Sequence, residues 1–313
     1  MSGRMINYPH VAAMVFNTPL YATPEVISSV KAVLIPRLTG ESLGSNLQLD
    51  HTETSLLSSS AEDHELKLMT ISNKIAIIPI HGVLVSRRGT IDNSCSELIS
   101  YERLRVQISA ALNHPDVSEI VLDLHTGGGM AMGCMEFADF VYQSRSIKPI
   151  TAIVNFAAYS AGYFIAAACS KVICSPTGGV GSVGVIMETY EVSVWEKEAG
   201  IKYNTFYRGA RKNDGSQHEP LTEEAAAEID GRLDISYMQF VSSVAKYRNL
   251  EEKAVIETQA KLFSAEDALA VGFVDEISPA QEAINTLADA YQVTEQIPSI
   301  GIRAKKIDLE VMA

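Results

Sequence analysis

From residue 75 onwards, short apolar runs alternate with stretches in which apolar residues recur at helical spacing. The runs are rich in β-branched residues, as buried strands are, and cover residues 75–80, 83–85, 119–124 and 149–155. The stretches between them predict helices over 101–113 and 131–145. Regular alternation of strand and helix favours right-handed βαβ crossovers. The pattern therefore predicts an α/β domain with a largely parallel sheet.

Helices are also expected outside this alternation. Residues 161–169 form an alanine-rich apolar stretch, and Thr222 precedes two glutamates at the start of a periodic stretch that reaches Arg248. Ser264 is a suitable N-cap for a further short helix. Near the N-terminus, prolines punctuate a segment that predicts one helix, over 25–37.

Composition along the chain suggests four parts. Residues 1–39 form an N-terminal helical arm, and residues 40–73, rich in Ser, Thr, Asn, Asp and Gly, read as a linker. Residues 74–280 hold the alternating pattern and form the main domain. Residues 281–313 are predicted to be a C-terminal helix and tail.

The charge and cysteine content exclude several classes of protein. A formal net charge of −13 argues against a nucleic-acid surface, which requires concentrated Lys and Arg. The four cysteines lack the spacing of a zinc site or of a disulfide framework, so we expect reduced thiols, a cytoplasmic location, no metal and no cofactor. No secretory signal is evident, because polar residues and proline interrupt the N-terminal apolar stretch.

The segment 156–184 holds the first candidate for chemistry, Ser160. This serine stands between a predicted strand and a predicted helix, where the first amides of the helix lack internal partners and favour a nearby oxyanion. The alternatives are a buried structural serine and, because residues 149–170 carry no charge, a membrane helix. The β-branched first half and alanine-rich second half favour a strand and a helix, so we expect no membrane insertion.

Three consecutive glycines, 127–129, follow another predicted strand. They match neither common nucleotide-binding motif, so they favour either an oxyanion hole built from backbone N–H groups or a tight turn. His125, next to them, is a candidate base, but nothing in the sequence places it beside Ser160. As a candidate general base, we rank His125 below Lys212.

Four motifs occur in order, and together they carry a resemblance. They are LDLHTGGGMAMG, AAYSAGYFIA, VGSVGV and RGARKNDG, over roughly residues 75–277. This combination resembles the protease IV, or signal peptide peptidase A, family of serine peptidases. The N-terminal YPHVAAMVFNTPLYATPEV is similar to the capsid-assembly proteases of tailed phages related to the lambda C protein. The resemblance implies a crotonase-like or Clp-protease-like fold.

The resemblance also implies roles for particular residues. Ser160 matches the nucleophile of the family, Lys212 its general base and Ser182 a serine that hydrogen-bonds the lysine. Gly128 and Gly129 match the paired glycines of the oxyanion hole, which the amide of Ala161 would complete. A lysine accepts a proton only when neutral, and its pKa in water is about 10.4, so burial is the expected means of activating it. Where the family has Ser-Pro or Thr-Pro before the glycines, this chain has Thr126-Gly127.

The implied function is a serine endopeptidase. By resemblance, its substrates would be scaffolding, portal or other capsid proteins in a procapsid, and the chain would form homo-oligomers. Three alternatives stay open. They are a cellular peptidase of the signal peptide peptidase type, an acyl-CoA enzyme on a crotonase-like fold, and an inactive assembly protein.

Overall fold

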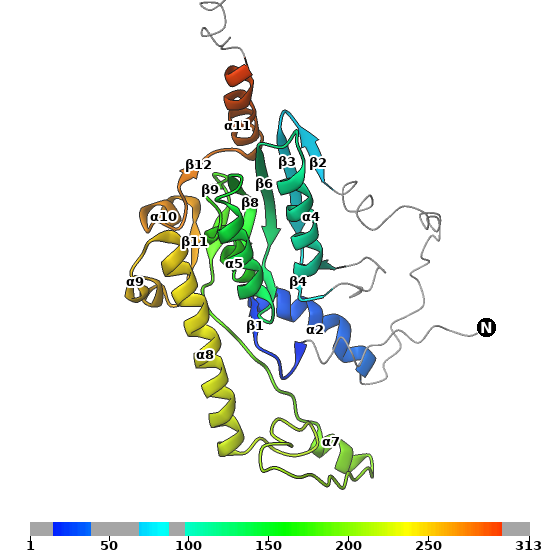
Figure 1. Cartoon of the computed structure of the whole chain (residues 1–313). Coiled ribbons are helices and arrows are strands. Elements are labelled where there is room, and N and C mark those ends of the chain that lie inside the picture. Colours follow the sequence, from blue (N-terminus) through cyan, green and yellow to red (C-terminus); the bar gives the residue numbers. More distant parts are fainter. Residues whose placement is uncertain (1–14, 39–68, 88–97, 296–313) are drawn as a thin grey trace, which may run out of the picture.

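The computed structural model describes residues 15–38, 69–87 and 98–295, and its centre is a large, mainly parallel β-sheet (Figure 1). The strands of its main path are, in spatial order, β11 (Leu262–Ser264), β10 (Gly179–Gly181), β8 (Ile150–Tyr159), β6 (Glu119–Thr126), β3 (Ile75–His81) and β2 (Thr70–Ser72). β9 (Lys171–Cys174) pairs with the first half of β8, and β12 (Glu276–Ile277) pairs with β9. Only β2 and β11 are antiparallel to their neighbours among the described strands of this sheet. The predicted largely parallel α/β arrangement is confirmed.

Strand alternation explains how both faces of this sheet are covered. In β6, Leu122 and Leu124 join the main apolar core, whereas Val121 next to Leu122 joins a second cluster on the other face. The main core is packed by α4 (Tyr101–Asn113), α5 (Cys134–Ser144), α6 (Ala161–Ala167) and α8 (Glu223–Arg248). The second cluster is covered by α11 (Ala280–Glu295) through Ala283 and Ala288.

A smaller sheet lies beside the large one, and the sequence pattern does not predict it. Its strand order is β1 (Leu20–Ala22), β7 (Gly128–Met130), β4 (Leu84–Val85) and β5 (Ile99–Ser100). β1 is antiparallel to β7, while β4 runs parallel to both β7 and β5. The N-terminal part of the chain, continued by α2 (Pro24–Leu38), is thus joined to the domain through this sheet. The boundary at residue 39 stays a prediction.

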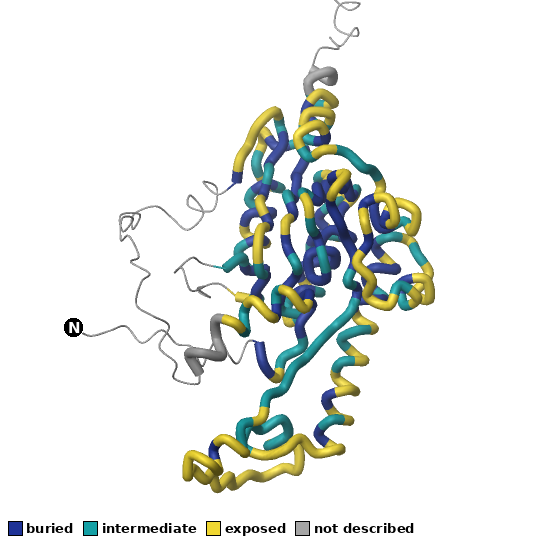
Figure 2. Tube along the Cα trace, turned by 180° about the vertical axis from the view of Figure 1, so that it is seen from behind, coloured by how far each residue is buried: buried dark blue, intermediate teal, exposed yellow. Residues whose placement is uncertain are grey.

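A projection, residues 187–222, extends away from the sheets together with the first half of α8 (Figure 1). It contains α7 (Ser193–Glu198), and its residues are largely exposed (Figure 2). α8 has 26 residues and is therefore roughly 39 Å long. Its first turn is capped by Thr222, whose hydroxyl accepts a hydrogen bond from the Ala225 amide at 3.1 Å, as the sequence predicts.

The remaining helices, α9 (Glu252–Glu257) and α10 (Ala265–Ala270), follow α8. Arg248, the last residue of α8, ties this helix to the sheet, and its side chain is only 8% exposed. Arg248 donates to both carboxylate oxygens of Asp275, at 2.6 and 2.9 Å, and to the carbonyl of Gly272. Asp275 also accepts the amide of Val172 in β9, at 2.7 Å. Burial would raise the pKa of Asp275, but the bonds from Arg248 and Val172 outweigh it and lower the pKa.

Asp275→Asn is expected to lower the free energy of unfolding by about 2 kcal/mol at pH 7, because it removes charge-assisted hydrogen bonds to a buried partner. The folded pKa lies below the unfolded value. The stabilisation is therefore present at neutral pH and is lost as the pH falls below about 4 and through the folded pKa. Urea unfolding at several pH values measures both effects. The exposed pair of Lys253 and Glu257 supplies the control, since Glu257→Gln should change stability by under about 0.5 kcal/mol. Equal effects of the two variants would contradict this account.

Candidate active site

Ser160 occupies the turn between β8 and α6 in a conformation that non-glycine residues rarely adopt. Its φ is 55° and its ψ is −119°, and the residue is 1% exposed. Such a conformation costs on the order of 1–3 kcal/mol and persists only where the surroundings enforce it. Here the Ser160 amide donates to the Gly181 carbonyl at 2.8 Å, and the Ser160 carbonyl accepts the Phe164 amide at 2.9 Å. A serine on a sharp, strained turn from strand to helix is the arrangement of a nucleophile elbow.

Two consecutive small residues bring the first turn of α6 against the end of β6. A side chain at Gly162 would place its Cβ 2.4 Å from Cγ2 of Thr126, so only glycine fits there. Ala161 precedes it, and as a first-turn residue its amide has no acceptor within the helix. Ser160 and Ala161 are therefore held next to the loop that contains the glycines.

The glycines of that loop are required by close packing of three backbones. A Cβ on Gly128 would lie 2.1 Å from the carbonyl oxygen of Tyr21 in β1, and one on Gly129 would lie 2.0 Å from that of Leu84 in β4. Gly128 also has a φ of 103°, in the region that favours glycine. Gly128 and Gly129 form the central strand β7 of the small sheet, and not the tight turn that is the alternative prediction.

Both glycine amides have partners in this arrangement. The Gly128 amide donates to Oγ1 of Thr126 at 3.0 Å, and the same hydroxyl donates to the Gly82 carbonyl at 2.5 Å. In the β1–β7 ladder, the Ala131 amide donates to the Pro19 carbonyl, and the Thr23 amide donates to the Gly127 carbonyl. In an antiparallel ladder every second residue pair is hydrogen-bonded. The pair between them, Tyr21 with Gly129, is then also hydrogen-bonded, so the Gly129 amide faces the Tyr21 carbonyl.

Thr126 is the residue whose role the sequence leaves unassigned. We assign it no catalytic role. Its hydroxyl accepts a hydrogen bond from the amide of Gly128, and its methyl group packs against Gly162. The signal is present in the sequence as the departure Thr126-Gly127, because a threonine before glycine can hydrogen-bond the backbone two residues on.

Ser182 lies close to Ser160 through the backbone. It directly follows Gly181, the acceptor of the Ser160 amide, and its own amide donates to the Lys261 carbonyl at 3.0 Å. Its φ is 55°, which makes it another serine held in the left-handed region. Within the described part of the chain, the hydroxyl groups of Ser160 and Ser182 have no hydrogen-bond partner.

Lys212 is not brought to Ser160 within one chain. It is an exposed residue of the projection, and its amide donates to Gly209 at 3.1 Å in a series of turns. Its side chain forms no hydrogen bond or ion pair with any residue that the structure describes. The structure thus brings together Ser160, Ala161, Ser182 and the glycine strand, and leaves Lys212 apart from them.

His125 points away from the candidate site. Successive residues of a strand face opposite sides, and Thr126 faces α6, so His125 faces the other side. There it is exposed, and its ring contacts Phe156, at a centroid distance of 5.9 Å, and His81, at 6.4 Å. This placement agrees with its lower rank as a base.

The alternative of a membrane helix at residues 149–170 is wrong, because this stretch contains strand β8 and the separate helix α6. Across the described ranges 15–38, 69–87 and 98–295, no helix combines the length and apolar character needed to cross a bilayer.

Comparison with known proteins matches part of the chain to a peptidase family. Residues 142–294 match the model of peptidase family S49. The match includes Ser160, Ser182 and Lys212 and begins after the glycine strand.

Two phage proteins are among the most similar relatives. Capsid assembly protease C of Escherichia phage lambda is 29% identical over 98% of this chain and 71% of the relative. Head-tail preconnector protein GP5 of Enterobacteria phage P21 is 30% identical over 91% of this chain and 58% of the relative. A putative signal peptide peptidase SppA of Enterococcus faecium is 28% identical, over 72% of this chain and 65% of the relative. The predicted likeness to the protease IV family and its phage members is confirmed.

Solved structures that match part of the chain include a peptidase and a hydratase. A mutant of the 1510-N membrane-bound stomatin-specific protease has a TM-score of 0.45 at 15% identity, covering 69% of this chain and 84% of its own. An enoyl-CoA hydratase from Shewanella pealeana has a TM-score of 0.44 at 10% identity, covering 75% of this chain and 78% of its own. The overlaps are too partial to bear on activity.

Two variants test whether Ser160 is strained. Ser160→Gly and Ser160→Ala both remove the hydroxyl, but only glycine adopts the observed φ and ψ without strain. We expect Ser160→Gly to be more stable than Ser160→Ala by about 1 kcal/mol in urea unfolding. A less stable glycine variant would show that the turn carries no strain.

Proposed function

We propose that this chain is a serine endopeptidase in which Ser160 is the nucleophile and Lys212 the general base. The observation that supports this most strongly is the buried, strained turn of Ser160 against the glycine strand. A protein has no structural need to hold a serine at this φ and ψ, since glycine would form the same turn at lower free energy. Strain of this kind is characteristic of functional positions.

The proposed mechanism gives each of these groups one role. Oγ of Ser160 attacks the substrate carbonyl, and its proton passes to the neutral amine of Lys212. The amides of Ala161, Gly128 and Gly129 stabilise the oxyanion, which requires Gly128 to give up its bond to Thr126 and Gly129 its bond to Tyr21. Lys212 then returns the proton to the leaving amine, and water hydrolyses the acyl-enzyme by the same path.

The separation of Lys212 from Ser160 suggests where the base comes from. The projection that carries Lys212 exposes several large apolar side chains, which favours contact with another protein surface. These residues are Val194, Trp195, Ile201, Tyr203, Phe206, Tyr207 and Leu221. Among them, Phe206 is the most exposed, at 90%. We therefore propose a homo-oligomer in which the projection of one copy brings Lys212 to Ser160 of another.

The substrates proposed are proteins of the phage head. Support comes from the relatives, whose names are a capsid assembly protease and a head-tail preconnector protein. By this likeness the chain would cut scaffolding, portal or other capsid proteins, in the host cytoplasm or inside a procapsid.

Ser160→Ala and Lys212→Ala should each reduce cleavage of co-expressed scaffolding and portal proteins by at least about 1,000-fold, because each removes a member of one catalytic unit. Intact mass spectrometry identifies the cut sites. Lys202→Ala is the matched control, since Lys202 is another exposed lysine of the projection and its loss should leave cleavage unchanged. Unchanged cleavage by Ser160→Ala would refute the nucleophile assignment.

Mixing the two inactive variants tests the shared site. If Lys212 acts on Ser160 of another copy, a mixed oligomer contains sites with both residues intact. Co-assembled Ser160→Ala and Lys212→Ala should then recover up to about a quarter of wild-type activity, as random pairing of equal amounts predicts. No recovery in a verified mixed oligomer would place both residues of a site in one copy.

A further inference from the structure

Residues 19–23 form an extended segment that is hydrogen-bonded along both edges. On one edge β1 pairs with β7 in antiparallel register, with Leu20 opposite Met130. On the other edge the Leu20 amide donates to the Ile186 carbonyl at 2.8 Å, and the Ile186 amide donates back at 3.0 Å. The segment is therefore the middle of three extended backbones.

The two outer backbones are those that adjoin the candidate nucleophile. β7 continues from Thr126, which contacts the first turn of α6, and residues 184–188 continue from Ser182. Gly181, just before Ser182, accepts the Ser160 amide. An extended peptide binds such edges through its backbone and directs alternate side chains to opposite sides. A peptide presented to Ser160 would thus occupy the place of residues 19–23.

The side chains of the segment show what this place accepts. Tyr21 is 1% exposed, and its ring lies 5.7 Å from that of Phe164 in α6 and 4.8 Å from that of Phe240 in α8. Its hydroxyl donates to the Ser236 carbonyl at 2.7 Å. Leu20 and Ala22 face the other way, in a small apolar cluster with Met130 and Ile186. The position is built for an aromatic side chain between two aliphatic ones.

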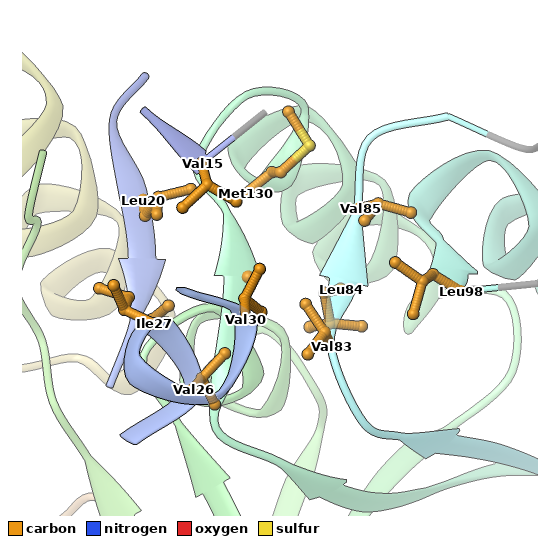
Figure 3. Close-up of a pocket in the computed structure, with 12 residues that line it drawn as sticks. Val15, Leu20, Val26, Ile27, Val30, Val83, Leu84, Val85, Leu98 and Met130 are labelled. Carbon is orange, nitrogen blue, oxygen red and sulfur yellow. The ribbon is translucent and has the colours of Figure 1, made fainter. Parts of the chain in front are cut away.

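Leu20 and Ala22 are also buried, but outside the main core. Apart from Tyr21, its buried apolar residues belong to a small cluster that is separate from the main core. A cavity of about 70 Å³ lies between the segment and the body, and apolar side chains line it (Figure 3). Val26, Ile27 and Val30 of α2 face Val83 and Leu84 across it. Elements with few buried contacts open at lower free energy than the core.

We propose that residues 19–23 are a built-in strand that occupies the substrate groove between β7 and residues 184–188. The substrate is an extended peptide with an aromatic residue flanked by aliphatic ones, and it takes this place when the segment leaves. The proposal rests on the peptidase function proposed above. The chain would then regulate itself through competition between its own strand and the substrate.

A cross-link tests the competition in the full chain. Leu20 and Ile186 form a hydrogen-bonded antiparallel pair, whose Cα atoms are about 5.5 Å apart, which suits a disulfide. Leu20→Cys with Ile186→Cys, made in the Ser160→Ala background, gives a protein whose groove is locked when oxidised and free when reduced. Intact mass, through the loss of two hydrogens, verifies the cross-link.

The probe is a fluorescein-labelled peptide with the sequence of residues 16–24, FNTPLYATP. A control peptide has aspartate at the position of Tyr21. Because a tethered strand competes at an effective concentration of about millimolar, the titration extends into that range. We expect the reduced protein to bind the probe at least about tenfold more tightly than the oxidised protein, and the control peptide to bind weakly to both. The single variant Ile186→Cys should show no such dependence on oxidation.

Equal binding by the oxidised and reduced proteins would overturn the proposal, as would equal binding of the two peptides. Cleavage is measured in parallel with the same cysteine pair and Ser160 intact, and it should stop on oxidation and return on reduction. If binding depends on oxidation but no Ser160-dependent cleavage is found, the peptidase function is refuted and the peptide-binding groove is supported. If cleavage persists in the oxidised protein, the peptidase function is supported and the proposal that residues 19–23 occupy the substrate groove is refuted.

Discussion

The structure depends on the close approach of three backbones at the glycine strand β7. Gly128 lies against the carbonyl of Tyr21 and Gly129 against that of Leu84, at distances that leave no room for a Cβ. This contact joins the N-terminal part of the chain to the small sheet. It also places the glycine amides beside the first turn of α6, so one packing constraint serves both the fold and the candidate active site.

The proposed active site has two structurally different parts. The proposed nucleophile and oxyanion donors are built into the rigid core, where burial and backbone hydrogen bonds hold Ser160 in an unfavourable conformation. The proposed base is carried by an exposed projection. A site divided in this way would be active only after assembly, which would confine proteolysis to the place where copies of the chain gather.

Sequence patterns were reliable where a periodic signal was long. The helix predicted over 101–113 has those bounds in the structure, and Thr222 caps α8 as expected. In the small sheet only β4 was predicted, within residues 83–85. The other short strands, β1, β5 and β7, have two or three residues each and carry no periodic signal. The sequence indicated Ser160 and the glycines as candidates, since local chain geometry sets the conformation of both. It could not show the strand between β7 and Ile186, because that pairing joins residues far apart in the chain.

The central claim is that Ser160 is the reactive nucleophile. It is tested most directly by treating the protein with an irreversible serine-acylating inhibitor, such as a β-lactone, and locating the adduct by peptide mapping. The account predicts one adduct, on Ser160, that depends on Lys212. An adduct on another serine, in protein that cleaves its substrate, would contradict the account.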